Sequence, residues 1–388
     1  MHIVADKGIP YVTEAFSGFG AITLVEGRSI NRKMIAGADI LLVRSVTPVT
    51  RALISGTKLK FIASATTGIE HIDLPCIQKC RIGFAYAPGS NARSVAQYVV
   101  AAIVHMAAKK DLTGAAAVPT AALRDLKFGI IGVGNIGSLV HTYAEALGMQ
   151  CLFNDPPKRR LSGNTVYRPL KEVLAGADFV TLHVPLEKQG SDPTYHLVDP
   201  DFLKQMKPGA VLLNTSRGKV VDEAALKKTR PKLGGLVVDV WDNEPGIDPE
   251  ICRMADIATP HIAGYSYDGK IRGTMMIHNA ACSFFKNAPF WNPAELLSEQ
   301  AGLIDATNAP DPVLHAVQHA YPIMRDDAVL RKKTLLNVKK RALSTGFDAL
   351  RAQYPKRLEF AHYEVRCTKL QSNAAEILTK LGFMVKIS

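Results

Sequence analysis

The stretch that decides the fold is Lys127-Phe-Gly-Ile-Ile-Gly132-Val-Gly134-Asn135-Ile136-Gly137. It begins as a short apolar run typical of a buried strand and continues into the pattern G-x-G-x-x-G, after which residues 136–147 have helical spacing. Three glycines permit a tight turn and let backbone N–H groups, including those of Asn135 and Ile136, approach a pyrophosphate at the helix N-terminus. The stretch therefore predicts a dinucleotide-binding strand–turn–helix unit.

Asp155 supplies the second feature of such a site. It follows the next apolar strand, residues 150–154, and lies 18 positions after Gly137. A carboxylate there can accept hydrogen bonds from the hydroxyls of the adenosine ribose. The same charge would repel a 2′-phosphate, which favours NAD over NADP, although the cations at 158–160 weaken that preference. We expect NAD as the cofactor.

Apolar runs alternate with helical patterns on both sides of the glycine stretch. This alternation implies βαβ units and parallel sheets, an α/β fold. Long helices are expected at 91–108 and 267–285. Strands are expected at 2–5, 22–25, 40–43, 61–65, 82–86, 127–131, 150–154, 179–182, 210–213, 236–240 and 257–258.

The composition limits the classes of protein that the chain can represent. It has 388 residues, 47% of them hydrophobic and 21% charged, which is typical of a folded globular protein. The longest apolar stretch, residues 98–108, is about half of the roughly 20 residues that a membrane-spanning helix needs. The first residues lack the pattern of a secretory signal, so we expect a cytoplasmic protein. Cys76 and Cys80 have no second pair to complete a zinc site, and we expect no metal.

The net charge of +12 is compatible with anionic partners of several kinds. Part of the excess lies in residues 301–388, which hold 14 Lys and Arg against 8 Asp and Glu. No nucleic-acid-binding motif accompanies this charge, so we expect neither a nucleic acid nor a membrane as partner. The tract at 287–295, with two prolines and two asparagines, is expected to link this region to the rest.

Three polar segments follow predicted strands, at 213–218, 238–245 and 259–265. Oxidation of a 2-hydroxy acid requires a cation for the carboxylate, a base for the hydroxyl proton and a group that orients the base. Arg217 suits the first role through its planar fork, and His261 suits the second because histidine is the most common general base in enzymes. Glu244 suits the third. Each residue alone has an ordinary structural explanation, and the three together in this order favour catalysis.

This order of motifs resembles the D-2-hydroxyacid dehydrogenase family, with the arginine, glutamate and histidine in those roles. The resemblance implies an NAD-binding Rossmann domain inserted into a flavodoxin-like substrate domain, with an active-site cleft between them, and a small C-terminal α+β dimerisation domain. The expected bounds are 1–108 and 266–286 for the substrate domain, 109–265 for the Rossmann domain and 290–388 for the C-terminal domain. It also implies a homodimer.

Further segments resemble a branch of this family that oxidises 4-phospho-D-erythronate on the route to pyridoxal phosphate. They are residues 42–47, 63–73, 87–92, 154–157, 261–265, 269–274 and 325–331. The substrate would then be a small, anionic, phosphorylated 2-hydroxy acid. By position, the resemblance implies substrate contacts at Ser45, Thr66 and Tyr265, and cofactor contacts, besides the glycine turn, at Asp155, Val184, Thr215, Ser216, Arg217, Asp239 and Gly264. Arg44 and Arg272 are candidates for the phosphate.

Two alternatives remain open on the sequence alone. The first is another D-2-hydroxyacid dehydrogenase, such as a phosphoglycerate dehydrogenase, because the catalytic residues are common to the whole family. The second is a non-catalytic protein that senses NAD and contacts nucleic acid through its basic C-terminal region. The intact set of Arg217, Glu244 and His261 argues against the second alternative.

Overall fold

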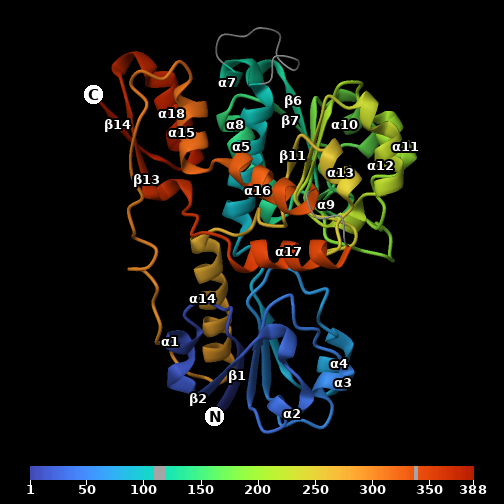
Figure 1. Ribbon diagram of the computed structural model, residues 1–388, viewed down its shortest axis with the longest axis vertical. Coiled ribbons are helices and arrows are strands. Elements are labelled where there is room, and N and C mark those ends of the chain that lie inside the picture. The colour runs from blue at the N-terminus through green and yellow to red at the C-terminus, as the bar shows by residue number, and fades with distance from the viewer. Residues whose placement is uncertain (109–118, 336–339) are drawn as a thin grey trace. The chain divides into compact units, whose positions relative to one another are not determined.

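The computed structural model divides by its contacts into two compact units (Figure 1). It describes residues 1–108, 119–335 and 340–388. Unit 1 consists of residues 1–92 and 266–299, and unit 2 consists of residues 93–265 and 300–388. Both units are built on parallel sheets, as the alternation of strand and helix patterns predicts.

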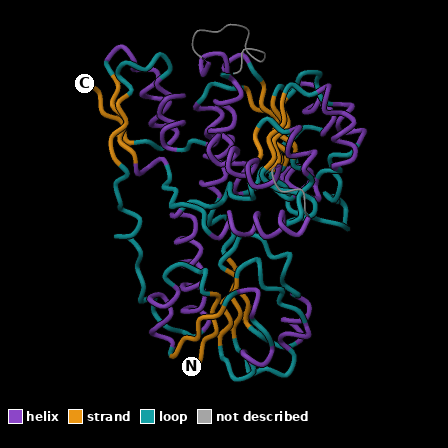
Figure 2. Tube along the Cα trace, in the orientation of Figure 1, coloured by secondary structure: helices purple, strands orange, loops and turns teal. Residues whose placement is uncertain are grey.

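Unit 1 contains a five-stranded parallel sheet in the order β2-β1-β3-β4-β5, drawn in orange in Figure 2. This is the flavodoxin-like order. Along β3, Ile40 and Leu42 belong to one buried cluster and Leu41 and Val43 to another, so both faces of the sheet are covered. The strands are β1 (His2–Asp6), β2 (Ala21–Val25), β3 (Ile40–Val43), β4 (Phe61–Ser64) and β5 (Gly83–Tyr86).

Helices cover both faces of this sheet. One face packs against α1 (Val12–Phe16) and α14 (Tyr267–Phe284), which contribute to the first cluster. The opposite face packs against three short helices: α2 (Arg32–Ile35), α3 (Arg51–Ile54) and α4 (Leu74–Lys79). Burial on both faces explains why these strands are continuous apolar runs without polar alternation.

Unit 2 contains a six-stranded parallel sheet in the order β11-β10-β9-β8-β6-β7. A parallel bridge from Phe153 to Tyr167 adds one more strand position outside β7. With that position included, the order is the 3-2-1-4-5-6 of doubly wound dinucleotide-binding folds, extended by β11, and it reverses at β6. The strands are β6 (Lys127–Ile131), β7 (Gln150–Asn154), β8 (Phe179–Leu182), β9 (Val211–Asn214), β10 (Gly235–Val238) and β11 (Ile257–Ala258).

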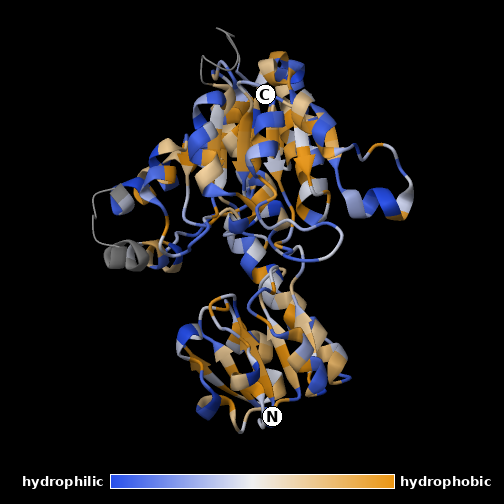
Figure 3. Cartoon of the chain, turned by 90° about the vertical axis from the view of Figure 1, so that its right-hand side faces the viewer, coloured by the Kyte–Doolittle hydropathy of each residue, from blue (hydrophilic) through white to orange (hydrophobic). Residues whose placement is uncertain are grey.

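The helices of this part of unit 2 have mainly hydrophilic outer surfaces, whereas its strands are hydrophobic (Figure 3). Most of these helices begin at an aspartate or glycine cap; Asp155, Asp199, Asp222 and Asp248 each accept backbone N–H groups of the first turn. The helices are α5 (Ala92–Ala107), α7 (Pro119–Ala122), α8 (Asn135–Ala146), α9 (Pro156–Ser162), α10 (Leu170–Gly176), α11 (Pro200–Gln205), α12 (Glu223–Thr229) and α13 (Pro249–Met254).

The C-terminal part of unit 2 is a small domain with its own parallel sheet, in the order β12-β13-β14. Its strands are β12 (Gly302–Asp305), β13 (Tyr363–Cys367) and β14 (Met384–Ile387), and its helices are α15 (Pro312–Ala320), α16 (Ile323–Leu335), α17 (Lys340–Ala352) and α18 (Ser372–Leu381). Helix α18 packs against α8, and α16 packs against β11 and α13. The C-terminal domain therefore shares a continuous core with the Rossmann sheet.

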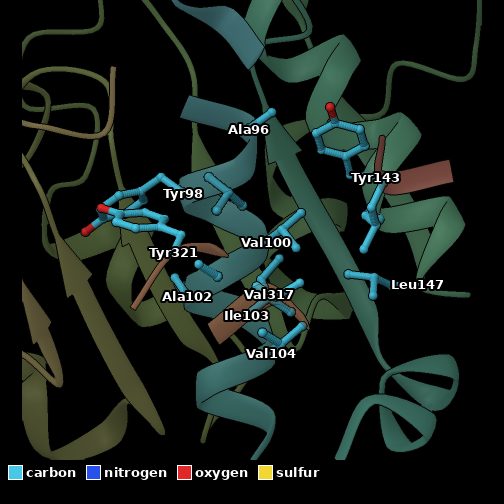
Figure 4. Close-up of a cluster of buried hydrophobic side chains, with 14 of the residues drawn as sticks. Ala96, Tyr98, Val100, Ala102, Ile103, Val104, Tyr143, Leu147, Val317 and Tyr321 are labelled. Atoms are coloured by element: carbon cyan, nitrogen blue, oxygen red, sulfur yellow. The ribbon is translucent and has the colours of Figure 1, made fainter. Parts of the chain in front are cut away.

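Helix α5 lies in the middle of that shared core. Figure 4 shows its residues Tyr98 and Val100 beside Val317 and Tyr321 of the C-terminal part. The rings of Tyr98 and Tyr321 are 6.0 Å apart. Because nearly all of its side chains are buried, the helix is apolar on every side, and it packs on the Rossmann sheet as well as on α15.

The predicted strands are all confirmed, with ends that agree to within two residues. The two long helices are confirmed as α5 and α14, and residues 287–295 form no helix or strand, as expected of a linker. Among the described helices, none combines the length and the apolar composition needed to cross a membrane.

The observed units differ from the expected domain bounds at two places. Residues 290–299, expected in the C-terminal domain, belong to unit 1. The sequence placed residues 93–108 with the N-terminal strands, whereas their contacts place them in unit 2. The physical reason is that α5 buries its side chains in the Rossmann and C-terminal core. The predicted division into three domains, with dimerisation through the last, stays a prediction.

Candidate active site

The glycine turn lies between β6 and α8, at the point where the strand order reverses. Gly132 has φ +86°, and a Cβ there would lie 2.6 Å from the carbonyl oxygen of His183. A Cβ on Gly137 would lie 2.1 Å from the carbonyl oxygen of Gly132. A Cβ on Gly134 would meet nothing within 4 Å. The fold itself thus requires the first and third glycines, while the second borders open space at the helix N-terminus, where a pyrophosphate can approach Asn135 and Ile136.

Asp155 lies directly after β7 and connects the glycine turn to that strand. Its Oδ2 accepts the backbone N–H of Val133 at 2.9 Å, and its Oδ1 accepts that of Lys158 at 3.0 Å, which caps α9. An ionised carboxylate has about four acceptor positions, so both oxygens can accept a further hydrogen bond from a ribose. The turn and its acidic partner are therefore held together before any ligand binds.

Two buried polar atoms near this turn have no hydrogen-bond partner among the residues that the structure describes. They are Oγ1 of Thr215 and Nδ1 of His183. Burial lowers the pKa of His183 to about 3, so the ring is neutral, and its Nε2 lies 3.0 Å from Oγ1 of Thr181. Val184 follows at the end of β8 and contacts the glycine turn. Unpartnered buried polar atoms are rare in proteins, and these two fit a polar ligand at the switch point.

Arg217 follows β9 in a loop that is fixed on both sides. Oδ1 of Asn214 accepts the backbone N–H of Ser216 at 3.1 Å and its hydroxyl at 2.8 Å. Nδ2 of Asn214 donates to the carbonyl of Arg217 at 3.0 Å, and NH1 of Arg217 donates to the carbonyl of Ser216 at 2.7 Å. The loop thus holds a half-buried guanidinium at the carboxyl end of the sheet, where such folds bind ligands.

Glu244 and His261 form a hydrogen-bonded pair, with Oε2 and Nδ1 2.7 Å apart. The other carboxylate oxygen, Oε1, accepts the backbone N–H of Trp241 at 2.9 Å. Burial raises the pKa of Glu244, but the adjacent imidazole and the hydrogen bonds from His261 and Trp241 outweigh it, so the pKa is lower than usual. An ionised glutamate on Nδ1 orients the ring and leaves Nε2 for proton exchange with a substrate.

Asp239 holds the segment that carries the histidine. Its buried carboxylate accepts hydrogen bonds from the Thr259 hydroxyl at 2.6 Å and from the backbone N–H groups of Ile262 and Ala263 at 2.8 and 3.0 Å. Burial raises its pKa, and His261 and these donors oppose the shift. His261 itself has φ +56°, a conformation that persists only where the surroundings impose it. Asp239, expected at the cofactor, thus also fixes the backbone beside His261.

The expected substrate residues of unit 1 lie at the carboxyl end of its sheet. Arg44 and the exposed Ser45 follow β3, and Thr66 follows β4. Arg44 donates to both oxygens of the buried Asp6, at 2.9 and 3.2 Å. Thr66 donates to the carbonyl of Gly68 at 3.0 Å, and its Oγ1 is 2.7 Å from the hydroxyl of Ser64.

The other expected substrate residues lie on either side of the boundary between residues 265 and 266. Arg272, on α14 of unit 1, donates from Nε to the carbonyl of Ser90 at 3.0 Å. Tyr265 is the last residue of its segment of unit 2, next to Gly264. These placements leave the substrate roles of all five residues as predictions.

Comparison with known proteins connects this geometry to a family. Residues 96–263 match the NAD-binding domain of the D-isomer specific 2-hydroxyacid dehydrogenases. The erythronate-4-phosphate dehydrogenase of Salinibacter ruber is 42% identical over 400 residues, covering 100% of this chain and 99% of the relative. That of Cellvibrio japonicus is 39% identical and covers 99% of both. The chain belongs to the D-isomer specific 2-hydroxyacid dehydrogenase family.

Solved structures match a smaller share of this dehydrogenase. The D-lactate dehydrogenase of Aquifex aeolicus, in complex with NAD and lactic acid, is 28% identical with a TM-score of 0.60. It covers 74% of this chain and 96% of its own. The NAD-bound 3-phosphoglycerate dehydrogenase of Entamoeba histolytica shares the fold at a TM-score of 0.62 and 23% identity, again over 74% of this chain. Residues 300–382 match a separate family described as a domain of unknown function (DUF3410).

Sequence reasoning missed the contacts that the C-terminal domain of this dehydrogenase makes with the histidine segment. NH2 of the buried Arg357 donates to the carbonyls of Ala263 and Ile262, at 2.7 and 3.3 Å, and to the hydroxyl of Ser94 at 2.6 Å. Its guanidinium also lies over the ring of Tyr321, 4.1 Å from the centre. Arg357 therefore binds the carbonyls of the same two residues whose N–H groups donate to Asp239.

Helix α16 fixes the strand that precedes the histidine. Oδ1 of Asp327 accepts the backbone N–H of Ala258 in β11 at 2.7 Å. Arg331 pairs with Asp327 at 2.8 Å and donates to the carbonyls of Cys252 and Ala255 at 2.6 and 2.8 Å. Both residues belong to the segment 325–331 that the family resemblance singled out, and the structure gives them a bracing role.

Arg351 is the third C-terminal arginine near the site. Its guanidinium carbon lies 5.5 Å from the centre of the Tyr265 ring. The sequence contains one signal for it, because Phe347, Leu350 and Arg351 fall on one stripe of α17 at helical spacing. A charged residue on an otherwise apolar face of a helix indicates that its side chain has a specific interaction partner.

Proposed function

We propose that this dehydrogenase oxidises 4-phospho-D-erythronate to 2-oxo-3-hydroxy-4-phosphobutanoate with NAD, a step toward pyridoxal phosphate. One observation carries the proposal: relatives named erythronate-4-phosphate dehydrogenase align over 98–100% of this chain, C-terminal domain included. The D-lactate dehydrogenase structure aligns over 74%. The full-length match to relatives of that name therefore supports this substrate over that of a general family member.

The cofactor site that supports this proposal is formed by the glycine turn, Asp155 and the loops after β8 and β9. The open space beside Gly134 and the unpartnered Oγ1 of Thr215 fit a bound dinucleotide. Val184, Ser216, Asp239 and Gly264 would complete the lining. When bound, NAD supplies the acceptor for a hydride.

Residues of the chain bind the substrate and transfer its proton. Arg217 binds the C1 carboxylate through its planar fork. His261 takes the proton of the C2 hydroxyl on Nε2 as the hydride leaves C2. Glu244, fixed by Trp241, orients the imidazole and stabilises its positive charge. Ser45, Thr66 and Tyr265 bind the rest of the substrate. Arg44 and Arg272, the candidates from the sequence for its phosphate, bind Asp6 and the carbonyl of Ser90. We also propose a cytoplasmic homodimer that associates through the C-terminal domain.

The test is NADH formation by the purified protein with 4-phospho-D-erythronate, 3-phosphoglycerate and D-lactate in parallel. A second set would include a 2-oxo acid acceptor, in case reduced cofactor stays bound. We expect kcat/KM for 4-phosphoerythronate to exceed that for D-lactate by at least about 100-fold, since a phosphate held by a charged partner contributes several kcal/mol. It should also exceed that for 3-phosphoglycerate, whose phosphate is one carbon closer to the reacting C2. A preference for 3-phosphoglycerate would overturn the substrate assignment and keep the catalytic roles.

A further inference from the structure

Arg351 lies at the C-terminal end of α17, beside a residue expected to bind substrate. Its guanidinium is 5.5 Å from the centre of the Tyr265 ring, within hydrogen-bonding reach of that side chain, and 5.9 Å from the ring of Phe347. Tyr265 also packs edge-on against Tyr354, with the ring centres 5.9 Å apart. The rings of Tyr265 and Phe347 thus hold the guanidinium beside the Tyr265 side chain.

The Nε atom of Arg351 is buried and has no hydrogen-bond partner within the part of the chain that the structure describes. A buried donor without an acceptor costs roughly 1–3 kcal/mol, and more when the group is charged. A partner of opposite charge would remove this cost. Two acidic groups, Glu244 and Asp348, act on Arg351 electrostatically, but neither accepts a hydrogen bond from its Nε. The two oxygens of Glu244 already bind Trp241 and His261.

Arg351 is therefore close to two parts of the proposed site. Its guanidinium lies beside the ring of Tyr265, and it acts electrostatically on Glu244, the carboxylate that is hydrogen-bonded to His261. The C2 hydroxyl of the proposed substrate reacts at His261, and its phosphate lies two carbons further along. A guanidinium is the side chain best suited to a phosphate dianion, because it offers two parallel N–H donors.

We propose that Arg351 binds the phosphate group of the substrate and thereby determines specificity for a phosphorylated 2-hydroxy acid. The inference rests on the proposed function and names the residue that recognises the phosphate. Arg351 belongs to the C-terminal domain, of which residues 300–382 form a separate family match.

The two arginines that the sequence suggested for the phosphate already bind other groups. Arg44 forms a two-bond pair with the buried Asp6, which neutralises its charge. Arg272 uses Nε to bind the carbonyl of Ser90. Of these three arginines, Arg351 has a buried Nε without an acceptor among the described residues, and it shares a unit with the catalytic pair.

The experiment compares Arg351→Met and Arg351→Lys with the wild type, using 4-phospho-D-erythronate and erythronate, which lacks the phosphate. Erythronate is measured as a substrate, or as an inhibitor where turnover is too slow. Arg366→Met is the matched control, because Arg366 is a C-terminal arginine in an exposed ion pair with Asp305. NAD affinity and thermal unfolding of every variant are recorded as well.

We expect Arg351→Met to lower kcat/KM for 4-phosphoerythronate by about 100-fold, mainly through KM, because it removes one charged partner of a desolvated pair. Erythronate and NAD should be affected less than threefold, and Arg351→Lys should restore about a tenth of the lost efficiency or more. The control should match the wild type. If Arg351→Met does not fold, the test uses Arg351→Lys instead. The proposal then predicts a fall in kcat/KM for 4-phosphoerythronate and no fall for erythronate.

Equal losses with both substrates, or no loss with either, would overturn the role of Arg351. Failure of the wild type to oxidise 4-phosphoerythronate would instead overturn the proposed function. The variants therefore test the role of Arg351, and the wild type tests the proposed function, within the same experiment.

Discussion

The two large sheets of the molecule both end in polar residues at the carboxyl ends of their strands, but they hold those residues differently. In unit 2, Asp239 accepts three hydrogen bonds, Glu244 binds both Trp241 and His261, and the C-terminal domain braces the same segment. In unit 1, Ser45 is exposed and the hydroxyl of Thr66 bonds to its near neighbours Ser64 and Gly68. The comparison teaches that unit 2 fixes reactive groups tightly, as catalysis requires, whereas unit 1 offers contacts suited to binding.

The largest effect should come from the tightly held pair. Replacing His261 with Ala removes the base, so we expect kcat to fall by about 1,000-fold. NAD affinity, measured by fluorescence titration, should change less than twofold, because the glycine turn and Asp155 are untouched. Activity within tenfold of wild type would show that another group accepts the proton.

Arg357→Met tests whether the C-terminal brace acts on the histidine segment. The change removes the donor to the carbonyls of Ile262 and Ala263 and leaves them buried, so unfolding should become easier by about 2–3 kcal/mol. In the folded variant we expect kcat to fall while KM for NAD stays the same. Arg366→Met is again the control, and an unchanged kcat would confine Arg357 to stability.

Gly134, the second glycine of the turn, tests whether the cofactor binds where unit 2 leaves open space. A Cβ on Gly134 meets no protein atom within 4 Å, and its φ of −79° suits any residue. Gly134→Ala should therefore unfold at the wild-type temperature but bind NAD at least about tenfold more weakly, a difference of 1.4 kcal/mol. Gly137→Ala, whose Cβ would lie 2.1 Å from a carbonyl, should instead lose stability. Normal NAD binding by Gly134→Ala would place the pyrophosphate elsewhere.

Buried His183 predicts a pH dependence of stability. Burial lowers its pKa to about 3 in the folded protein, against an ordinary value of 6.5. Between these values the unfolded chain binds more protons than the folded one, so stability falls as pH falls from about 6.5 toward 3. His183→Gln should reduce this slope by up to about 1.4 kcal/mol per pH unit in urea unfolding between pH 4 and 6. An unchanged slope would contradict the neutral, buried state.

Ser45 in unit 1 should give the smallest effect. Its loss removes one neutral hydrogen bond, so Ser45→Ala should raise KM for the substrate by about fivefold, since such a bond contributes about 1 kcal/mol. Neither kcat nor the unfolding temperature should change measurably. A large loss of kcat would mean that unit 1 contributes to the chemistry itself and would break the comparison.

The sequence predicted the strands and the glycine turn well because both depend on local patterns. A strand buried on both faces, such as β3, must be a continuous apolar run, and Gly132 and Gly137 are required by contacts under 3 Å. Glu244 and His261 were found together because their order follows that of neighbouring strands. Their hydrogen bond was then observed at 2.7 Å.

The contacts of the C-terminal domain could not be predicted in the same way. Arg357 meets Ile262 and Ala263 across more than 90 positions of sequence, and helical periodicity shows which face of a helix is buried, not what covers it. The same limit explains why α5 was assigned to the wrong neighbours: an all-apolar helix does not reveal which sheet it packs against.

The central claim is that His261 takes a proton while a hydride leaves C2 of the substrate. The most direct measurement uses 4-phospho-D-erythronate with deuterium at C2 and analyses the reduced cofactor by mass spectrometry. The account predicts one deuterium on each reduced nicotinamide and none in the solvent, together with a slower turnover of the labelled substrate. Deuterium in the solvent would contradict the account, because it would mean that C2 loses a proton instead of a hydride.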